Sequence, residues 1–260
     1  VGDVKTEVAQ HEMSLKVDFT LDGKPLRNSD QSSTDKSKQV RTILELDGDA
    51  VTKVKLAYEQ KEKTSRSGEA EPATATLPVS GKSYTVTLKD GKLIVVGAAG
   101  EDVSKDEAAI VGNDCKSLGK PERFAQFLDG KSVKVGEKLA FTDEAVTELF
   151  GSGSEGMRVE NVSMTLKSVA TEQEQKCGVF ETQLSLVKLQ GGVETRVTLS
   201  GEVAASVETC AAVSVRVAGT LTANRSGDTP NGKMEMKGNG EIKMIQSVTS
   251  GKSADVPAQK

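Results

Sequence analysis

Alternation between apolar and polar residues runs through most of the chain and constrains its fold more than any other feature. From Met13 to Leu21 every second residue is apolar, and the residues between them are polar. The same pattern recurs in several runs, and Asp90-Gly91 between two of them is a strong hairpin signal. A period of two places the apolar side chains on one face of a β-strand. The sequence therefore predicts antiparallel strands with one buried and one solvated face.

The C-terminal half shows this alternation most clearly. The runs 193–207, 213–221 and 234–248 each keep most of their apolar residues on one parity. The runs 157–170 and 177–189 are also strand-like, but their apolar parity switches, which indicates a bulge or burial on both sides. About nine or ten strands are expected in all. So many strands favour a sheet that curls strongly or closes partly over a flat one.

Helix signals occur only in the middle of the chain. Ser104-Lys-Asp-Glu107 forms a capping box that predicts a helix start. Pro121 precedes a second short segment, 122–128, and Thr142 is placed to cap a third, Asp143 to Phe150. Helices this short need a packing partner, and the apolar face of the sheet is the obvious one.

These patterns predict a mainly β fold, a large curved antiparallel sheet forming a half-barrel or partly open barrel, with about three short helices on one face. We expect a flexible N-terminal segment over residues 1–12 and a disordered tail over residues 250–260. A single β-rich domain would span 13–249, with a helical insertion at about 104–150. The alternative is two domains that divide near Gly153.

Composition disfavours several classes of function. Lys and Arg total 34 and Asp and Glu total 38, which gives a net charge of −4 with no basic cluster, so we expect no nucleic-acid partner. No run approaches the roughly 18 apolar residues of a transmembrane helix. His11 is the sole histidine, which leaves no Cys/His metal set, and no nucleophile elbow or phosphate-binding loop is present. We therefore expect no enzyme, no cofactor and no metal, and His11 reads as a solvated side chain.

The three cysteines indicate which cellular compartment the protein occupies. Cys177 and Cys210 each begin a strand-like run, with one full strand between them, so both lie at the same end of a meander. A disulfide between them would close a loop of about 30 residues and would imply an oxidising compartment. The alternative is two buried free cysteines in a cytosolic protein. Cys115 is expected to be buried in a short helical segment.

The broad apolar face is the main functional candidate. One interpretation is a cavity or groove between sheet and helices that holds a lipid or another apolar ligand. The other is an ordinary packed core. Methionines suit adaptable apolar surfaces, and they gather in the last run. The candidate cavity residues are Phe124, Phe127, Leu128, Met234, Met236 and Met244.

Four short segments carry a family resemblance: Gly81-Lys-Ser-Tyr84-Thr-Val-Thr, Gly130-Lys-Ser-Val-Lys-Val-Gly136-Glu137, Cys177-Gly-Val-Phe180 and Val207-Glu-Thr-Cys210. Over about residues 40–248 the chain resembles a group of uncharacterised bacterial secreted proteins and lipoproteins. The resemblance implies that the Cys-x-x-Phe strand pairs its cysteine with the Thr-Cys strand. The order of elements is also similar to that of the LolA/LolB and LppX-type lipoprotein carriers, in which short helices close a curved sheet around a lipid-binding hollow.

Together these features predict a non-catalytic protein of the bacterial cell envelope, whether periplasmic, anchored to the outer membrane or secreted. Its expected ligand is a lipid or other apolar molecule held between sheet and helices. The alternative is a structural, adhesion or protein-interaction module with a packed core and an envelope protein as its partner. Membrane anchoring would come only from a removed N-terminal lipid signal.

Overall fold

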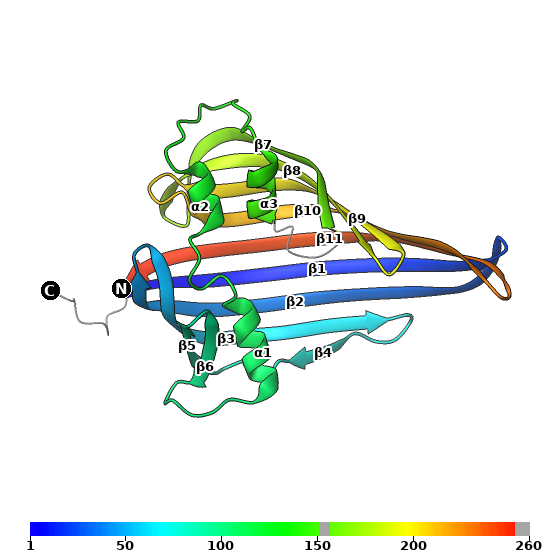
Figure 1. Cartoon of the computed structure of the whole chain (residues 1–260), viewed down its shortest axis with the longest axis horizontal. Helices are drawn as coiled ribbons and strands as arrows, with labels where there is room; N and C mark the ends of the chain where they lie inside the picture. Colours follow the sequence, from blue (N-terminus) through cyan, green and yellow to red (C-terminus); the bar gives the residue numbers. More distant parts are fainter. Residues whose placement is uncertain (151–156, 253–260) are drawn as a thin grey trace.

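The computed structural model describes residues 1–150 and 157–252, and most of them lie in one antiparallel sheet of 11 strands (Figure 1). The strands are β1 (Asp3–Leu21), β2 (Lys24–Asp47), β3 (Ala50–Ser67), β4 (Ala73–Thr76), β5 (Ser83–Lys89), β6 (Lys92–Gly97), β7 (Met157–Glu172), β8 (Gln175–Gln190), β9 (Val193–Ser206), β10 (Ala212–Thr229) and β11 (Gly232–Lys252). In the described ranges the helices are α1 (Lys105–Asp114), α2 (Arg123–Leu128) and α3 (Asp143–Phe150). The predicted fold class, a large antiparallel sheet with three short helices, is confirmed.

The first and last strands of the chain lie side by side in the middle of the sheet. The strand order is β6-β5-β3-β2-β1-β11-β10-β9-β8-β7, with β4 paired to β3. β1 and β11 pair along their whole length, from Asp3 opposite Lys252 to Leu21 opposite Met234. The sheet is therefore continuous from one half of the chain to the other. Gly153, where the alternative domain boundary was placed, lies outside the described residues.

The ends of the sequence differ from the expectation of flexible segments. Residues 3–12 belong to β1, which pairs with β2 on one side and β11 on the other. Ser250 to Lys252 extend β11 opposite Asp3 to Lys5. Backbone hydrogen bonds to two neighbours need no apolar side chains, so a polar stretch can still be a central strand. The remainder of the predicted tail, 253–260, lies outside the described residues.

Two local predictions are confirmed by the backbone. Asp90 and Gly91 have positive φ values of 51° and 74°, as the type I′ hairpin turn between β5 and β6 requires. The parity switch predicted for 157–170 corresponds to register shifts between β7 and β8, at Val159/Asn161 and at Leu166/Ser168. Each shift moves the following side chains to the opposite face, which keeps the apolar ones in the core.

Helices α1 and α2 cover the same face of the sheet, here called the inner face. Residues directly opposite each other in neighbouring strands point to the same side. One row of such partners crosses the sheet through Phe180, Val203, Val215, Gln246 and Ala9. The next row on the same face starts two residues away from Ala9 on β1, and it runs through Glu7, Gln39 and Tyr58. Tyr58 packs in the core that contains the end of α1 and Phe180 in the core beneath α2, so α1 and α2 lie on one side.

The apolar residues form two separate cores on this inner face (Figure 1). The N-terminal core lies between α1 and strands β3, β5 and β6; its buried members are Val54, Leu56, Tyr58, Val79, Tyr84, Val86, Val111, Cys115 and Leu118. The C-terminal core lies between α2 and strands β7 to β9; its buried members are Leu128, Leu139, Met164, Leu166, Phe180 and Ala205. The central strands β1 and β11 contribute no buried member to either core.

Three glycines let the sheet curve across its C-terminal half. Gly201, Gly219 and Gly240 lie on the inner face of β9, β10 and β11, offset by two residues from each strand to the next. A Cβ on Gly219 would stand 1.7 Å from the carbonyl oxygen of Thr198, and one on Gly240 would stand 1.9 Å from that of Ser14. No side chain fits at such a distance, so the strands approach closely along this diagonal and the sheet can bend there.

The predicted capping box is present at the start of α1. The Ser104 Oγ accepts a hydrogen bond from the Glu107 amide, and the Ser104 amide donates to the Glu107 carboxylate at 3.1 Å. Lys82 Nζ and the Tyr84 hydroxyl also donate to Glu107, at 2.7 and 2.8 Å. These bonds, with that from Lys82 the largest, lower the pKa of Glu107 to about 2. The carboxylate thereby ties α1 to β5 and to the loop before it.

Replacement of Glu107 by glutamine should change how stability responds to acid. The folded-state pKa of Glu107, about 2, lies below its ordinary value of 4.5, so its ionised form stabilises the fold above pH 4.5 and that contribution is lost as the pH falls toward 2. A glutamine side chain at this position keeps the capping geometry but does not titrate. The difference in Tm between wild type and Glu107→Gln should be largest near neutral pH and vanish near pH 2. A difference that stays constant with pH would contradict this role.

The predicted disulfide between Cys177 and Cys210 does not form in the structure, where all three cysteines are free thiols. Cys177 packs against Val179, Ala204 and Val213 on the outer face. Cys210 lies in the turn between β9 and β10 and packs against the C-terminal core on the inner face. Both residues lie at the expected end of the meander, but the sheet separates their side chains. Cys115 is buried at the C-cap of α1, as predicted.

Candidate ligand-binding site

A strip of apolar side chains crosses the inner face between the two cores. We call it the central strip, and it consists of Met13, Leu15, Val17 and Phe19 of β1 with Met234, Met236, Ile242 and Met244 of β11. Ile242 lies opposite Met13, and Met236 lies opposite Phe19. None of these side chains is buried and none joins either core; the Met13 side chain is 42% exposed. The strip is therefore an apolar surface that the described helices leave partly open.

The two sides of the central strip differ. Toward β10 the inner face stays apolar, with Val217, Leu221 and Ala223 all buried. Toward β2 it becomes polar, because Ser33 lies opposite Met13 and Gln31 lies opposite Leu15. At the far end the guanidinium of Arg27 lies 4.3 Å from the centre of the Phe19 ring. The central strip thus has apolar neighbours on the β10 side and polar neighbours on the β2 side.

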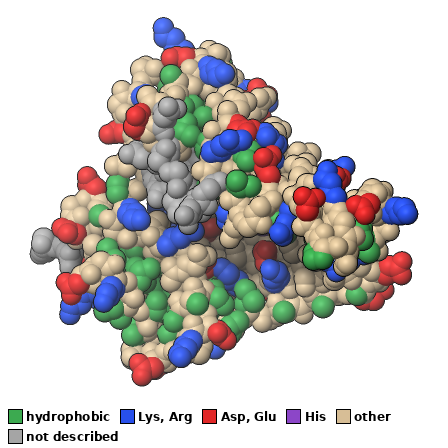
Figure 2. Space-filling model, turned by 45° about the vertical axis from the view of Figure 1, so that its right-hand side comes forward, with side chains coloured by type: hydrophobic (Ala, Val, Ile, Leu, Met, Phe, Trp, Pro, Cys, Tyr) green, Lys and Arg blue, Asp and Glu red, His purple; other side chains and the backbone are tan. Residues whose placement is uncertain are grey.

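A cavity of 290 Å³ lies on the inner face next to the near end of this strip. It lies between strands β1 to β3 and the last residues of α1. Its lining consists of Glu7, Ala9, His11, Asp35, Lys36, Ser37, Gln39, Lys61, Glu62, Leu77, Asn113 and Asp114. Figure 2 shows the molecule hollowed near its centre, with hydrophobic, acidic and basic side chains around the hollow. The cavity is mainly polar, unlike the strip.

Asp114 fixes one wall of the cavity. Its carboxylate oxygen Oδ2 accepts a hydrogen bond from the Tyr58 hydroxyl at 2.7 Å and pairs with Lys61 Nζ at 2.5 Å. The guanidinium of Arg41 donates to the backbone carbonyl of Asp114 at 3.0 Å. Burial, and then the hydrogen bond to Asp114, raises the pKa of Tyr58 well above its usual range, so the tyrosine stays a donor. These contacts hold the end of α1 against β2 and β3.

Gln39 stands out among the lining residues. Its side chain is 6% exposed, and its Nε2 donates to the Glu7 carboxylate at 3.1 Å. Its carbonyl oxygen Oε1 is buried and accepts no hydrogen bond from any residue in the described ranges. A buried acceptor without a donor costs about 1–3 kcal/mol. Because this oxygen has almost no accessible surface, the unfilled hydrogen-bonding position lies behind the cavity wall and is not open to the cavity.

The structure places the six predicted cavity residues in two different locations. Phe124, Phe127 and Leu128 belong to α2 and pack in the C-terminal core, where the Phe124 ring meets that of Phe180 edge to face at 6.3 Å. Met234, Met236 and Met244 lie on the central strip. None of the six lines the 290 Å³ cavity.

The cavity lining includes His11, Asp35 and Gln39, which the sequence did not single out as site residues. His11, expected to be a solvated side chain, is exposed, and it also lies in the cavity wall, opposite Asp35. The signal that could have located it is its parity, since His11 continues the alternation of Met13 and Leu15. For Asp35 and Gln39 no such signal exists, because residues 27–39 of β2 are polar on both faces.

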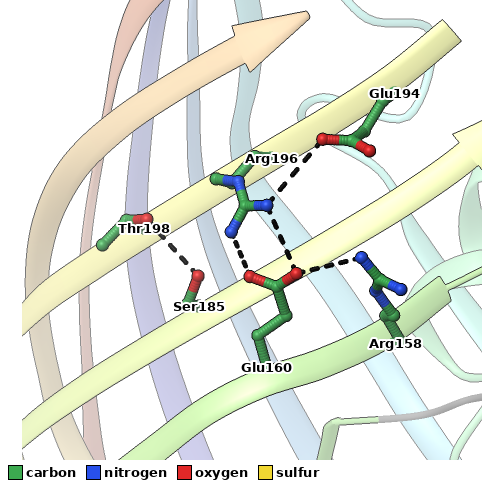
Figure 3. A network of polar contacts seen from close by, with 6 residues as sticks. All are labelled: Arg158, Glu160, Ser185, Glu194, Arg196 and Thr198. Atoms are coloured by element: carbon green, nitrogen blue, oxygen red, sulfur yellow. Dashed lines mark hydrogen bonds and ion pairs between the residues drawn. The ribbon is translucent and has the colours of Figure 1, made fainter.

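A network of polar side chains lies on the outer face of β7 to β9 (Figure 3). Glu160 of β7 bonds both Arg158, at 3.1 Å, and Arg196 of β9, and Arg196 also lies 3.8 Å from Glu194. Ser185 and Thr198 face each other across β8 and β9 on the same side. Exposed ion pairs of this kind contribute only about 0–1 kcal/mol each. This network marks the part of the outer face that it covers as a solvated surface.

Comparison with known proteins gives no family for this chain. No family model matches the sequence, and no curated protein matches it. Among solved structures, one of lipovitellin, titled for its lipid–protein interactions, aligns with a TM-score of 0.34 and 9% identity over 100% of this chain and 26% of that chain. This chain thus spans about a quarter of lipovitellin. The outer membrane protein OprG from Pseudomonas aeruginosa aligns with a TM-score of 0.19 and 7% identity over 97% of each chain.

A third solved structure, that of MucB in complex with MucA(peri), aligns with a TM-score of 0.13 and 9% identity over 94% of each chain. At scores this low the likenesses identify neither a family nor a function, and the resemblance to lipoprotein carriers stays a prediction. No helix in the described ranges is long and apolar enough to cross a membrane.

Proposed function

We propose that this protein is a non-catalytic binding protein of the bacterial cell envelope and that the central strip holds the acyl chain of a lipid. The strip itself supports this proposal: it is a continuous run of partly open apolar side chains between two packed cores. A folded protein that leaves contiguous apolar surface open commonly uses it to bind something. Here the surface lies on the face that also carries α1 and α2.

The shape and chemistry of the strip suit an acyl chain. From Met13 to Phe19 it runs about 20 Å along one strand, the reach of an extended long chain. It offers no hydrogen-bonding group, so binding would come from non-directional apolar burial. Half of its side chains are methionines, whose flexible thioethers adapt to ligands of varying shape.

A second candidate, a protein-interaction module, has one observation in its favour. β7 is an end strand of the sheet, and residues 136–139 cover only its middle, through hydrogen bonds to Met164 and Leu166. An uncovered strand edge can pair with a strand from another chain. This candidate requires no apolar ligand, so the experiment below separates the two.

A charge placed on the central strip should abolish lipid binding. We expect wild type to bind a fluorescent long-chain fatty acid saturably and Met13→Glu to weaken that binding at least tenfold, since a carboxylate in contact with the chain must lose its hydration. Val8→Glu is the matched control, because Val8 lies on the outer face of the same strand and is 45% exposed against 42% for Met13. Equal effects of the two substitutions, or no saturable binding at all, would refute the proposal.

A further inference from the structure

We propose that the hairpin end of the sheet docks on an anionic lipid surface through its inner face. The hairpin end comprises the turn between β1 and β2 and the turn between β10 and β11, with the adjoining residues 17–30 and 223–238. Both hairpins extend past the helices, at the right of Figure 1. The proposal rests on the way charge and apolar surface are divided between the two faces there, and it does not require an acyl chain on the central strip.

The inner face of the hairpin end combines basic and apolar side chains. Two rows of cross-strand partners make up this face: Arg27, Phe19, Met236 and Arg225, then Lys24, Leu21, Met234 and Gly227. Neither row contains a carboxylate. The side chains of Lys24, Arg27 and Arg225 are exposed, and none of the three forms an ion pair with a residue in the described ranges. This face therefore carries positive charge that the protein itself does not neutralise.

The carboxylates of the hairpin end lie elsewhere. By their strand parity, four of them point to the outer face: Asp18, Asp30, Asp228 and Glu235. The cations on that face are paired, since Glu235 lies 3.0 Å from Lys233 Nζ and 3.6 Å from Lys237 Nζ. The fifth carboxylate, Asp22, lies in a turn and accepts a hydrogen bond from the Lys233 amide at 2.8 Å. Acidic and basic groups are thus segregated between the two faces.

The two hairpins form one surface before any partner binds. The Asp22 amide donates to the Lys233 carbonyl at 2.9 Å, so the bond described above is reciprocated and joins the first turn to β11. β1 and β11 stay paired as far as Leu21 opposite Met234. A surface held in this way loses little conformational freedom on binding, which favours docking as a unit.

An anionic bilayer matches this surface. Arg27 and Arg225 stand three strand spacings apart, about 14 Å, so together with Lys24 they suit several anionic groups spread over a plane. The apolar side chains between them suit the region beside lipid headgroups, whereas a nucleic acid would leave Leu21 and Met234 against phosphates. A bilayer bound here would lie against the Phe19 end of the central strip, the end from which an acyl chain would enter it.

Co-sedimentation with vesicles tests the docking directly. The probes are vesicles of phosphatidylcholine alone and vesicles of equal parts phosphatidylcholine and phosphatidylglycerol, with no fatty acid present. We expect the anionic vesicles to bind about tenfold more tightly or better, and added salt to weaken that binding by screening. Equal binding to both kinds of vesicle, or binding to neither, would overturn the proposal. Release by millimolar inorganic phosphate at constant ionic strength would also overturn it, because it would indicate a site for a single anion.

Two double variants of equal net charge test which face docks. Arg27→Gln with Arg225→Gln removes two charges from the inner face, and Lys233→Gln with Lys237→Gln removes two from the outer face at the same end. The first pair should weaken binding to anionic vesicles about tenfold or more, and the second no more than about twofold. Circular dichroism checks that both variants stay folded. Equal losses would indicate general charge attraction and contradict docking by the inner face.

The chain contains no tryptophan, so an introduced indole reports on its own position. Leu21→Trp places it on the inner face of the hairpin end and Thr20→Trp on the outer face. Anionic vesicles should shift the emission of Leu21→Trp to shorter wavelength and leave that of Thr20→Trp unchanged. A shift in both variants, in Thr20→Trp alone or in neither would contradict the proposal. None of these measurements uses fatty-acid binding, so failure here is distinct from failure of the proposed function.

Discussion

Gly219→Ala should destabilise the protein by about 3 kcal/mol or more, one of the largest effects of any single methyl addition in the sheet. The added Cβ would stand 1.7 Å from the Thr198 carbonyl oxygen and 2.7 Å from its carbonyl carbon. Both are backbone atoms, so no side-chain rotation relieves the clash. β10 and β9 would have to move apart, and the curvature of the inner face would change with them.

Gly227→Ala is the control for this substitution, because Gly227 lies in the same strand and a Cβ there meets nothing within 4 Å. Its effect should stay within about 0.5 kcal/mol. Urea unfolding followed by circular dichroism measures both variants. Similar stabilities for the two would show that the close approach of β9 and β10 is not needed for the fold.

Phe180→Ala should cost about 3–5 kcal/mol. The Phe180 ring is 4% exposed in the C-terminal core and meets the Phe124 ring of α2 at 6.3 Å. A helix as short as α2 is not stable alone, so loss of this contact should also loosen it. We expect faster amide hydrogen exchange over residues 123–128 in the variant.

Leu189→Ala provides the comparison in the same strand, at a side chain that is 59% exposed. It should change stability by no more than about 0.5 kcal/mol and leave exchange in α2 as in wild type. If exchange in α2 were the same in Phe180→Ala as in wild type, α2 would not depend on the C-terminal core.

The sequence predicted the fold class because one physical rule governs most of the chain. Apolar side chains of β1, β9, β10 and β11 recur mainly with a period of two, and those of β7 switch at bulges; both features follow from one buried face. Hairpin and capping signals, such as Asp90-Gly91 and Ser104 with Glu107, depend only on neighbouring residues. Such local signals can be recognised without knowing what the segment packs against.

The candidate site could not be predicted in the same way, because it depends on strand order. Nothing in the sequence shows that β11 pairs with β1 at the centre of the sheet while α2 packs toward its β7 end. Met236 and Phe124 were therefore expected in one cavity, yet they lie in separate places. Similarly, Gln39 and Asp114 are brought together by β2 and α1, segments far apart in the chain.

The direction of the side chains also explains why Cys177 and Cys210 do not form the predicted disulfide. The meander brings the strand ends that carry Cys177 and Cys210 to the same end of the sheet, as the spacing predicted. Their side chains still lie on opposite faces. Cys177 has the opposite parity to the inner-face residue Phe180 in β8, whereas Cys210 packs in the same core as Phe180. Strand positions can be predicted from spacing, but the direction of a residue in a turn cannot.

The central claim, that an acyl chain lies on the central strip, can be tested by NMR of the methionine methyl groups with a spin-labelled fatty acid. The strip places Met13, Met236 and Met244 on the open inner face, while Met164 is buried in the C-terminal core. We expect the label to broaden the signals of Met13, Met236 and Met244 and to spare that of Met164. Broadening of Met164 alone, or of none of these signals at saturating ligand, would contradict it.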